Sequence, residues 1–306
     1  MKRGLRYASV SRPRSLIICV TAYLSAGAIA LATGYVLRGS HPVLIAGIAD
    51  LTATATVFIF SVIFDNSSLY DPYWSVIPVF IVLFWTLHPD AAGANTVRQI
   101  VVMVLLGSWA VRLTFNWVRR WRGLGHEDWR YTDFRKQSGR YYWPVSFAAI
   151  HLVPTVLVFA GCFSIYVAVS AGTGAFGILD FPAIIVTAAA IIIETVADRQ
   201  LYEFLATGKA KGQVLTSGLW AYSRHPNYFG EVLFWWGLYL FAVAAAPAYW
   251  WAIFGPLAMT ALFIFISVPM IEKHMAAGRP DYLKIRTGVP KLLPRFPGKR
   301  RSNPAS

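Results

Sequence analysis

Eight long apolar segments restrict what this chain can fold into. They lie near residues 15–37, 43–64, 74–87, 99–118, 145–170, 181–204, 229–246 and 249–271. Several approach the roughly 20 residues that a helix needs to cross a bilayer. Because 57% of the 306 residues are hydrophobic and only 14% are charged, one water-soluble core could not bury them all. The sequence therefore predicts an all-α, polytopic membrane protein with about seven or eight transmembrane helices.

Basic residues gather in alternate loops. Lys and Arg are frequent in segments 1–14, 119–144, 205–228 and 273–301, whereas the opposite loops hold little beyond Arg38, Arg98, Asp90 and Asp180. Cytoplasmic loops carry an excess of Lys and Arg, so both chain ends are expected in the cytoplasm of a multi-pass cell-membrane protein. The same pattern indicates that the net charge of +14 serves loops facing anionic membrane lipids rather than binding to nucleic acid.

The first apolar segment admits two interpretations. A basic leader followed by an apolar run that ends in AGAIALATG resembles a cleavable signal peptide, but the run is long for one, which favours an uncleaved anchor. We divide the chain into N-terminal spans (1–64), a functional membrane domain (65–296) and a basic tail (297–306). Both cysteines, Cys19 and Cys162, lie in apolar runs, so neither a disulfide framework nor a metal site is predicted.

The stretch LWAYSRHPNYFGEVLFWWG, residues 219–237, places polar residues at the start of a Trp-rich run. Proline is favoured in the first turn of a helix, so we expect the helix to begin at Pro226. The N–H groups of Asn227, Tyr228 and Phe229 would then be free at the helix mouth, where they could bind a phosphate. The polar residues of this candidate site are Arg224, His225, Asn227, Tyr228 and Glu231, of which the histidine is more typical of a helix cap than of a catalyst.

A polar stripe marks the end of the fourth apolar segment, in GSWAVRLTFNWVRRWRG. Arg112, Asn116 and Arg119 are spaced i, i+4, i+7 and therefore share one helix face. Arg112 starts about two turns below the cytoplasmic end, too deep for simple snorkelling, and indicates an anion or cavity role. Snorkelling is sufficient to explain Arg119.

Two carboxylates share a face near the end of the sixth segment, in IIIETVADRQLYEF. Glu194 and Asp198 are spaced i, i+4, an arrangement that is repulsive unless each carboxylate has its own donor. The donor could be a ligand. It could equally be Arg112 or Arg224 in an internal salt bridge.

The motif LYDPYW precedes the shortest apolar segment. Only fourteen uncharged residues follow Tyr73 before a histidine, so a full span would draw Tyr70, Asp71 and Tyr73 into or near the membrane interface. Ionisable groups at such depth tend to face a cavity or a partner. Asp71 could equally cap the following helix. Asp50, which lies inside its own span, is expected to pair with an arginine.

These motifs together resemble the steroid 5-alpha-reductase superfamily. GLWAYSRHPNYFGEVLFWWG, with ETVADRQ before it and PMIEKHMAAGRPDYLKIRTGVPKLLPRFP after it, is similar to the C-terminal domain of that superfamily. GHEDWRYTDFRKQSGRYYW resembles its largely uncharacterised bacterial branch, and the likeness covers residues 70–296. The resemblance implies that NADPH binds at the cytoplasmic membrane face. It also implies reduction of a carbon–carbon double bond in a lipophilic substrate that is sterol-like, isoprenoid or lipid.

The resemblance also implies roles for individual residues. The cofactor-binding residues would be Arg112, Asn116, Arg119, Glu194, Asp198, Arg224, His225, Asn227, Tyr228, Glu231, Glu272 and Tyr282. Steroid reductases polarise the substrate carbonyl with a glutamate and a tyrosine. Here the tyrosine position holds Trp109, which cannot transfer a proton, and this departure argues against a steroid substrate. Asp71 stands in for the glutamate, with Tyr70 or Tyr73 as the proton donor.

A second enzyme class shares the R-H-P-x-Y-x-G motif. Membrane methyltransferases related to the isoprenylcysteine carboxyl methyltransferases combine it with a C-terminal glutamate, so Glu272 could bind the ammonium group of S-adenosylmethionine. ETVADRQ, NYFGE and the arginine stripe favour the reductase, because a dinucleotide carries phosphates and the methyl donor carries none. A transporter or lipid-binding scaffold would explain buried charges but not an anion site at a helix mouth.

Overall fold

Eight helices long and apolar enough to cross a membrane form the bundle of the computed structural model, which describes residues 7, 10–207, 213–279 and 281–295. The first four spans are α1 (Arg12–Val36), α2 (Pro42–Ile63), the turn η2 (Ser67–Tyr70) with α3 (Tyr73–Leu87), and α4 (Thr96–Arg120). The fifth joins α5 (Trp129–Ser138), α6 (Tyr142–Val145), the π-helical η5 (Ser146–Leu152), α7 (Val153–Tyr166) and η6 (Val167–Ala171).

The last three spans are α8 (Asp180–Ala206), α9 (Pro226–Ala245) and a run of η9 (Pro247–Ile253), α10 (Phe254–Ala261), η10 (Leu262–Ser267) and α11 (Val268–Gly278). The turns η3 (Pro89–Gly93), η4 (Gly139–Tyr141) and η8 (Gly218–Ala221) lie in connections, and α12 (Tyr282–Ile285) follows the last span. The all-α membrane architecture is confirmed, as is the start of α9 at Pro226.

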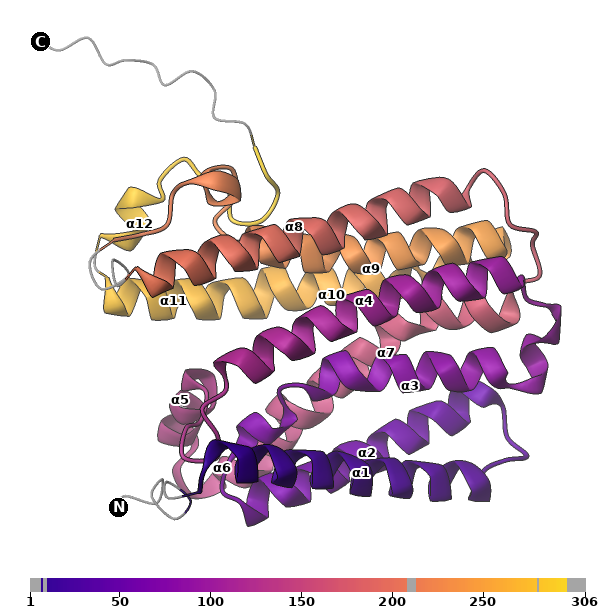
Figure 1. Ribbon diagram of the computed structural model, residues 1–306, viewed down its shortest axis with the longest axis horizontal. Helices are drawn as coiled ribbons and strands as arrows, with labels where there is room; N and C mark the ends of the chain where they lie inside the picture. Colours follow the sequence, from indigo (N-terminus) through magenta and orange to yellow (C-terminus); the bar gives the residue numbers. More distant parts are fainter. Residues whose placement is uncertain (1–6, 8–9, 208–212, 280, 296–306) are drawn as a thin grey trace, which may run out of the picture.

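The connections that the sequence marks as basic lie at one end of the bundle. Figure 1 shows the start of α1, the connection from α4 to α5, the described part of the α8–α9 connection and helix α12 at that end. The α1–α2, α3–α4 and η6–α8 connections lie at the other end. We call the end that carries the basic connections the basic end. This arrangement agrees with the alternation of charged and uncharged loops.

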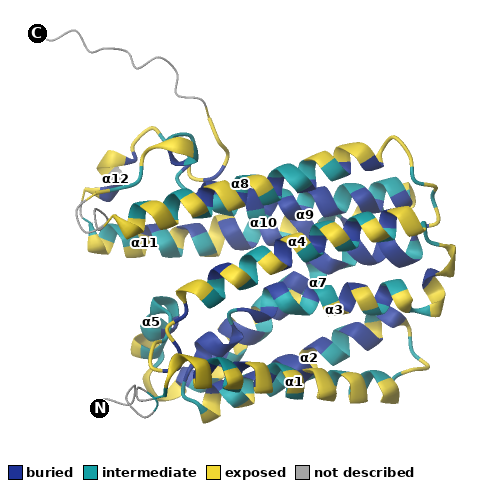
Figure 2. Ribbon diagram, in the orientation of Figure 1, coloured by how far each residue is buried: buried dark blue, intermediate teal, exposed yellow. Residues whose placement is uncertain are grey.

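Apolar side chains cover much of the outside of the bundle. Leu24, Phe80, Ile185 and Phe265 are between 61% and 75% exposed, and Figure 2 shows exposed residues along the outer faces of α1 and α8. A water-soluble protein rarely exposes apolar surface on this scale. The chain is therefore an integral membrane protein, with lipid as the solvent of these faces.

Glycines set the close packing of α8 on α9. A Cβ atom added at Gly230 would lie 3.0 Å from the carbonyl oxygen of Ala190, and one added at Gly237 would lie 2.9 Å from the backbone nitrogen of Thr187. Small residues at such contacts let two helix backbones approach closely. The contact brings the second turn of α9 against the middle of α8, where Glu194 lies.

A buried ion pair closes the end of the bundle opposite the basic end. Arg98 on α4 and Asp180 on α8 are 0% and 1% exposed, and Arg98 Nε lies 2.6 Å from Asp180 Oδ1. Arg98 also donates to Asp180 Oδ2 and to the carbonyl oxygens of Gly174 and Ala175. The pair thereby ties α4, α8 and the connection before α8 together.

Asp50 does not pair with an arginine, so that prediction is wrong. Its Oδ1 accepts a hydrogen bond of 2.7 Å from the Tyr73 hydroxyl at the start of α3. The physical reason is helix arrangement, because α2 packs against α3. Two arginines of α4, the buried Arg98 and the partly buried Arg112, turn instead toward carboxylates of α8.

Candidate functional site

A cavity of about 560 Å³ lies between α3, α4, α5 and α7 on one side and α8 to α11 on the other. We call it the main cavity. Its charged or hydrogen-bonding lining residues include Asp71, Ser75, Arg112, Arg120, Arg130, Tyr131, Glu194, Asp198, Asn227, Tyr228, Glu231 and Ser267. The rest of the lining is aromatic or aliphatic. The volume falls within the range of small-molecule sites, and the mixed lining suits an amphipathic ligand.

Arg112 joins α4 to α8 within the main cavity. Its Nη1 lies 2.9 Å from Asp198 Oδ2, and its Nη2 forms an ion pair with Glu194. Asn116 donates to the same oxygen of Asp198 at 2.9 Å, and Asn227 on α9 donates to the other at 3.3 Å. The sequence left open whether Arg112, Arg224 or a ligand meets the two carboxylates. The structure places Arg112 there.

Glu231 occupies the next turn of α9, where two indole groups hold it. Trp109 Nε1 and Trp235 Nε1 each donate to its carboxylate at 3.0 Å. Arg112 Nη2 lies 4.0 Å from the same group. Trp109 therefore uses its indole donor within the protein.

The main cavity is not the cation-rich site that the arginine stripe predicts. Its lining carries the carboxylates of Asp71, Glu194, Asp198 and Glu231 against the guanidinium groups of Arg112, Arg120 and Arg130. Arg119 lies outside this lining and stacks over the ring of Tyr202 at 3.9 Å. The last turn of α4 directs the Arg119 side chain toward the outer face of α8.

The mouth of α9 also differs from the prediction. The N–H group of Phe229 donates to the carbonyl of His225 at 3.0 Å, and that of Tyr228 donates to Asn227 Oδ1 at 3.1 Å. Neither N–H group is free to bind a phosphate, because the first helical turn and the Asn227 side chain already satisfy them. An anion in the main cavity would therefore meet guanidinium and amide side chains rather than a helix end.

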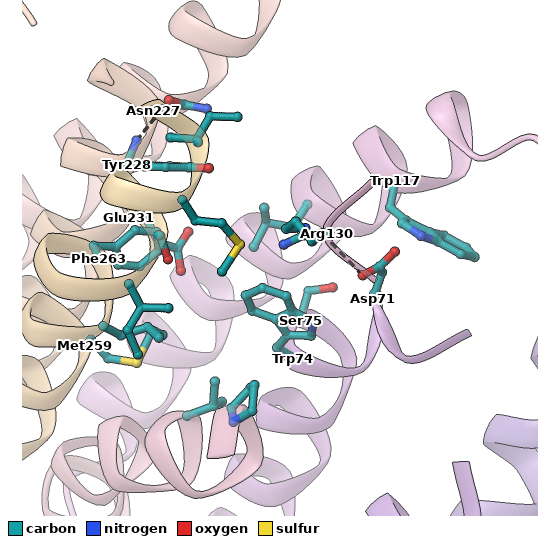
Figure 3. A pocket seen from close by; sticks show the side chains of 18 of the residues that line it. Asp71, Trp74, Ser75, Trp117, Arg130, Asn227, Tyr228, Glu231, Met259 and Phe263 are labelled. Atoms are coloured by element: carbon teal, nitrogen blue, oxygen red, sulfur yellow. Dashed lines mark hydrogen bonds and ion pairs between the residues drawn. The ribbon is translucent and has the colours of Figure 1, made fainter. Parts of the chain in front are cut away.

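Asp71 faces the main cavity beside a tyrosine from a different helix. Tyr131 on α5 donates a hydrogen bond to Asp71 Oδ1, and Arg130 Nη2 lies 3.5 Å from the same oxygen. The Asp71 side chain is 12% exposed and Tyr131 is 4% exposed. Asp71 is not the helix cap considered above, since Pro72 occupies the capping position of α3 without a side-chain hydrogen bond. Figure 3 shows Asp71, Arg130 and Ser75 on one wall and Glu231 and Asn227 on the opposite wall.

Tyr70 and Tyr73 lie outside the main cavity. The Tyr70 hydroxyl contacts Thr155 and donates to the carbonyl of His151 at 2.9 Å, and Tyr73 donates to Asp50. Both rings are nearly fully buried and pack with Ala26 of α1 and Ala53 and Val57 of α2. The structure therefore separates these two hydroxyl groups from Asp71, although the three residues are close in sequence.

Four of the predicted cofactor residues form a second group, which we call the C-terminal cluster: Arg224, His225, Glu272 and Tyr282. Arg224 Nη1 lies 3.0 Å from Glu272 Oε1, and Arg224 Nε donates to the carbonyl of Val289. Burial lowers the pKa of His225 to about 4, against the opposing effect of Glu272, so the ring is neutral near pH 7. Tyr282 is buried at the start of α12. None of the four lines the main cavity, because the chain after α11 folds back over the start of α9.

Comparison with known proteins identifies the family. The family described as "Protein of unknown function (DUF1295)" matches residues 57–287, which is more than half of the chain. The chain belongs to the DUF1295 family. An uncharacterized protein of Schizosaccharomyces pombe (strain 972 / ATCC 24843) is 27% identical over 258 residues, which cover 76% of this chain and 74% of that protein. No solved structure matches this DUF1295 protein significantly.

The DUF1295 match contains the main cavity and the C-terminal cluster in full, and it begins within α2. Three cavity residues of the matched region, Arg120, Arg130 and Tyr131, were missed by sequence reasoning. Arg130 and Tyr131 belong to the basic loop between two apolar segments, and α5 folds them back onto the cavity. The quoted motif GHEDWRYTDF was the available signal. Trp129 of the same motif stacks on His274 of α11 with ring centroids 3.8 Å apart.

Proposed function

We propose that this DUF1295 protein is an integral membrane reductase that uses NADPH to saturate a carbon–carbon double bond conjugated to a carbonyl group. The substrate would be a lipophilic small molecule. The observation that carries the proposal is the Asp71–Tyr131 pair on the wall of a cavity whose other lining is largely apolar. The resemblance of the sequence to the steroid 5-alpha-reductase superfamily supports the same chemistry.

Reduction of a conjugated double bond adds a hydride to carbon and requires a proton and a donor to the developing oxyanion. Tyr131 can give its phenolic proton to the substrate, and a protonated Asp71 can replace that proton across their hydrogen bond. Arg130, 3.5 Å from Asp71, is a second donor on the same wall. The pair thus provides the acid that Trp109 cannot provide.

The main cavity also offers free donors for an acceptor-rich ligand. Trp74 Nε1 and Arg112 Nε are buried and have no hydrogen-bond partner within the described part of the chain, and both residues line the main cavity. A bound NADPH would supply the hydride. Arg112, Arg120 and Asn227 are the side chains that would hold its amide and phosphate oxygens.

One observation favours the methyltransferase as a second candidate. Four carboxylates and three guanidinium groups line the main cavity, and S-adenosylmethionine carries a sulfonium and an ammonium group. Glu272, the predicted ammonium ligand, lies instead in the C-terminal cluster, where it contacts Arg224, and it also contacts Lys291. Methyl transfer also leaves the Asp71–Tyr131 pair without a use.

A ligand titration separates the two candidates. We expect NADPH to raise the melting temperature of the detergent-purified protein more than NADH or S-adenosylmethionine does, because only a ligand of the folded state stabilises it. Arg120→Gln should weaken NADPH binding by about tenfold, since it removes a charge-assisted contact. Arg122→Gln, in the exposed connection after α4, is the matched control. A response to S-adenosylmethionine alone would decide for the methyltransferase.

The proposal also requires that the basic end faces the cytoplasm, where NADPH is present. Ser217→Cys, in the α8–α9 connection, should then react with an impermeant maleimide only after the membrane is permeabilised. Thr173→Cys, exposed at the opposite end, should react in intact cells. Cys19 and Cys162 are buried and give little background. Ser302, a further predicted cytoplasmic position, lies outside the described residues. Labelling of Ser217→Cys in intact cells would reverse the orientation and remove the cofactor from reach.

A further inference from the structure

A second cavity, of about 630 Å³, lies on the other face of α7. The first half of α2, the face of α7 that carries Val156, Phe159 and Phe163, and the turn η9 form its walls. The main cavity uses a different face of α7, with Val153 and Val158, and no described residue lines both cavities. We call the second cavity the α2–α7 groove.

The α2–α7 groove opens on the lipid-facing surface of the bundle. Leu44 and Leu51 of α2 and Val156 of α7 line it and are 52%, 42% and 52% exposed. All three belong to helices that are long and apolar enough to span the membrane. An apolar opening in that position exchanges its contents with the bilayer rather than with water.

One carboxyl group lies among the mainly aliphatic and aromatic residues that line the groove. Asp50 lines the groove and is 3% exposed as a residue. Its Oδ1 accepts from Tyr73, which is the one side-chain donor to this carboxyl group within the described residues. A buried carboxyl oxygen inside a membrane span is costly without further donors. No described Lys or Arg lines the groove, and both ring nitrogens of its one imidazole, His41, have partners in Val43 and Tyr166, so the groove carries no fixed positive charge for an anionic headgroup.

We propose that the α2–α7 groove binds a neutral lipid alcohol, whose hydroxyl group donates a hydrogen bond to Asp50. The apolar body of the lipid lies against Phe159 and Phe163, and its polar end satisfies the carboxyl oxygen that Tyr73 does not reach. This site is separate from the reaction cavity and does not depend on the reductase proposal. Both a fused-ring alcohol of the sterol type and a linear prenol have this chemistry.

Photolabelling in phosphatidylcholine nanodiscs tests the site. A diazirine-bearing cholesterol probe should label α2 and α7 in the peptides that contain Leu44 and Val156. Excess cholesterol or farnesol should reduce this labelling by about tenfold, whereas cholestane, which lacks the hydroxyl group, should not, because a hydrogen bond to the carboxyl group is lost. Competition by only one of the two alcohols identifies the lipid class and still supports the site.

Two variants locate the labelling. Val156→Trp fills the groove at a lipid-exposed position that tolerates a large side chain, so it should abolish the label while the melting temperature stays unchanged. Ile266→Trp, at a half-exposed position of the main cavity, is the matched control and should label normally. Unchanged labelling of Val156→Trp, or equal competition by cholestane and cholesterol on the unmodified protein, would overturn the proposal.

Discussion

Tyr131→Phe is expected to lower the turnover of a conjugated enone by about 100- to 10,000-fold, the usual contribution of a positioned acid. The substitution removes one hydroxyl group and keeps the ring, which is 4% exposed. NADPH binding should be unchanged, since the hydroxyl group of Tyr131 is not among the groups proposed to hold the cofactor. The measurement is NADPH oxidation by purified protein with a panel that contains a 3-oxo-4-ene steroid and a prenyl enone. Tyr141→Phe, an exposed tyrosine ten residues further on, is the control.

Asp71→Asn should also lower the turnover of the conjugated enone. Asparagine keeps the shape and can still contact Tyr131, but it cannot replace a proton that Tyr131 has given away. A pair that acts as one unit gives non-additive effects, so the double variant should be little slower than Tyr131→Phe alone. If both single variants bound NADPH and reduced the enone at the wild-type rate, the proton donor would have to be another group.

Arg98→Ala is expected to have the largest effect on stability, about 3–5 kcal/mol of the free energy of unfolding. It leaves the Asp180 carboxylate buried without its cation and frees the carbonyl oxygens of Gly174 and Ala175. Equilibrium unfolding in mixed micelles of increasing denaturing detergent measures the change. Arg38→Ala, at an exposed position of the neighbouring α1–α2 connection, should change stability by less than about 0.5 kcal/mol.

The double variant Arg98→Met with Asp180→Leu distinguishes a lost charge pair from a lost contact surface. Apolar residues of similar volume can replace a buried ion pair at little cost, so this variant should recover much of the stability that Arg98→Ala loses. A loss below about 1 kcal/mol in Arg98→Ala itself would show that water reaches Asp180.

The spans and the start of α9 could be predicted because their causes are local. Span length depends on the apolar run, and Pro226 fixes the first turn of its helix. Helical periodicity placed Arg112 and Asp198 on polar faces at corresponding depth, which made Arg112 one of the candidate partners of the carboxylates, although Arg224 and a ligand stayed open. Such features need no knowledge of how distant loops return to the bundle.

The partners of Asp50, Arg224 and Tyr131 could not be predicted because their causes are not local. Whether Asp50 meets a tyrosine or an arginine depends on which helix packs against α2. Arg224 turns to Glu272 because the chain after α11 folds back over α9. Tyr131 reaches Asp71 because α5 folds under the cavity instead of remaining in solvent. Sequence spacing alone does not tell which helices pack together or where these segments fold back.

The glycine contacts between α8 and α9 determine which parts of the wall can move. Gly230 and Gly237 add no side chain of their own to the contact, so the backbones of α8 and α9 lie close together and we expect the two helices to move as one body. If the main cavity opens, we expect the separation to lie between this body, together with α11, and the wall made by α4 and α5. Trp129 of α5 and His274 of α11 are stacked with ring centroids 3.8 Å apart, so this contact and the Arg112–Asp198 ion pair both join the two walls and oppose their separation.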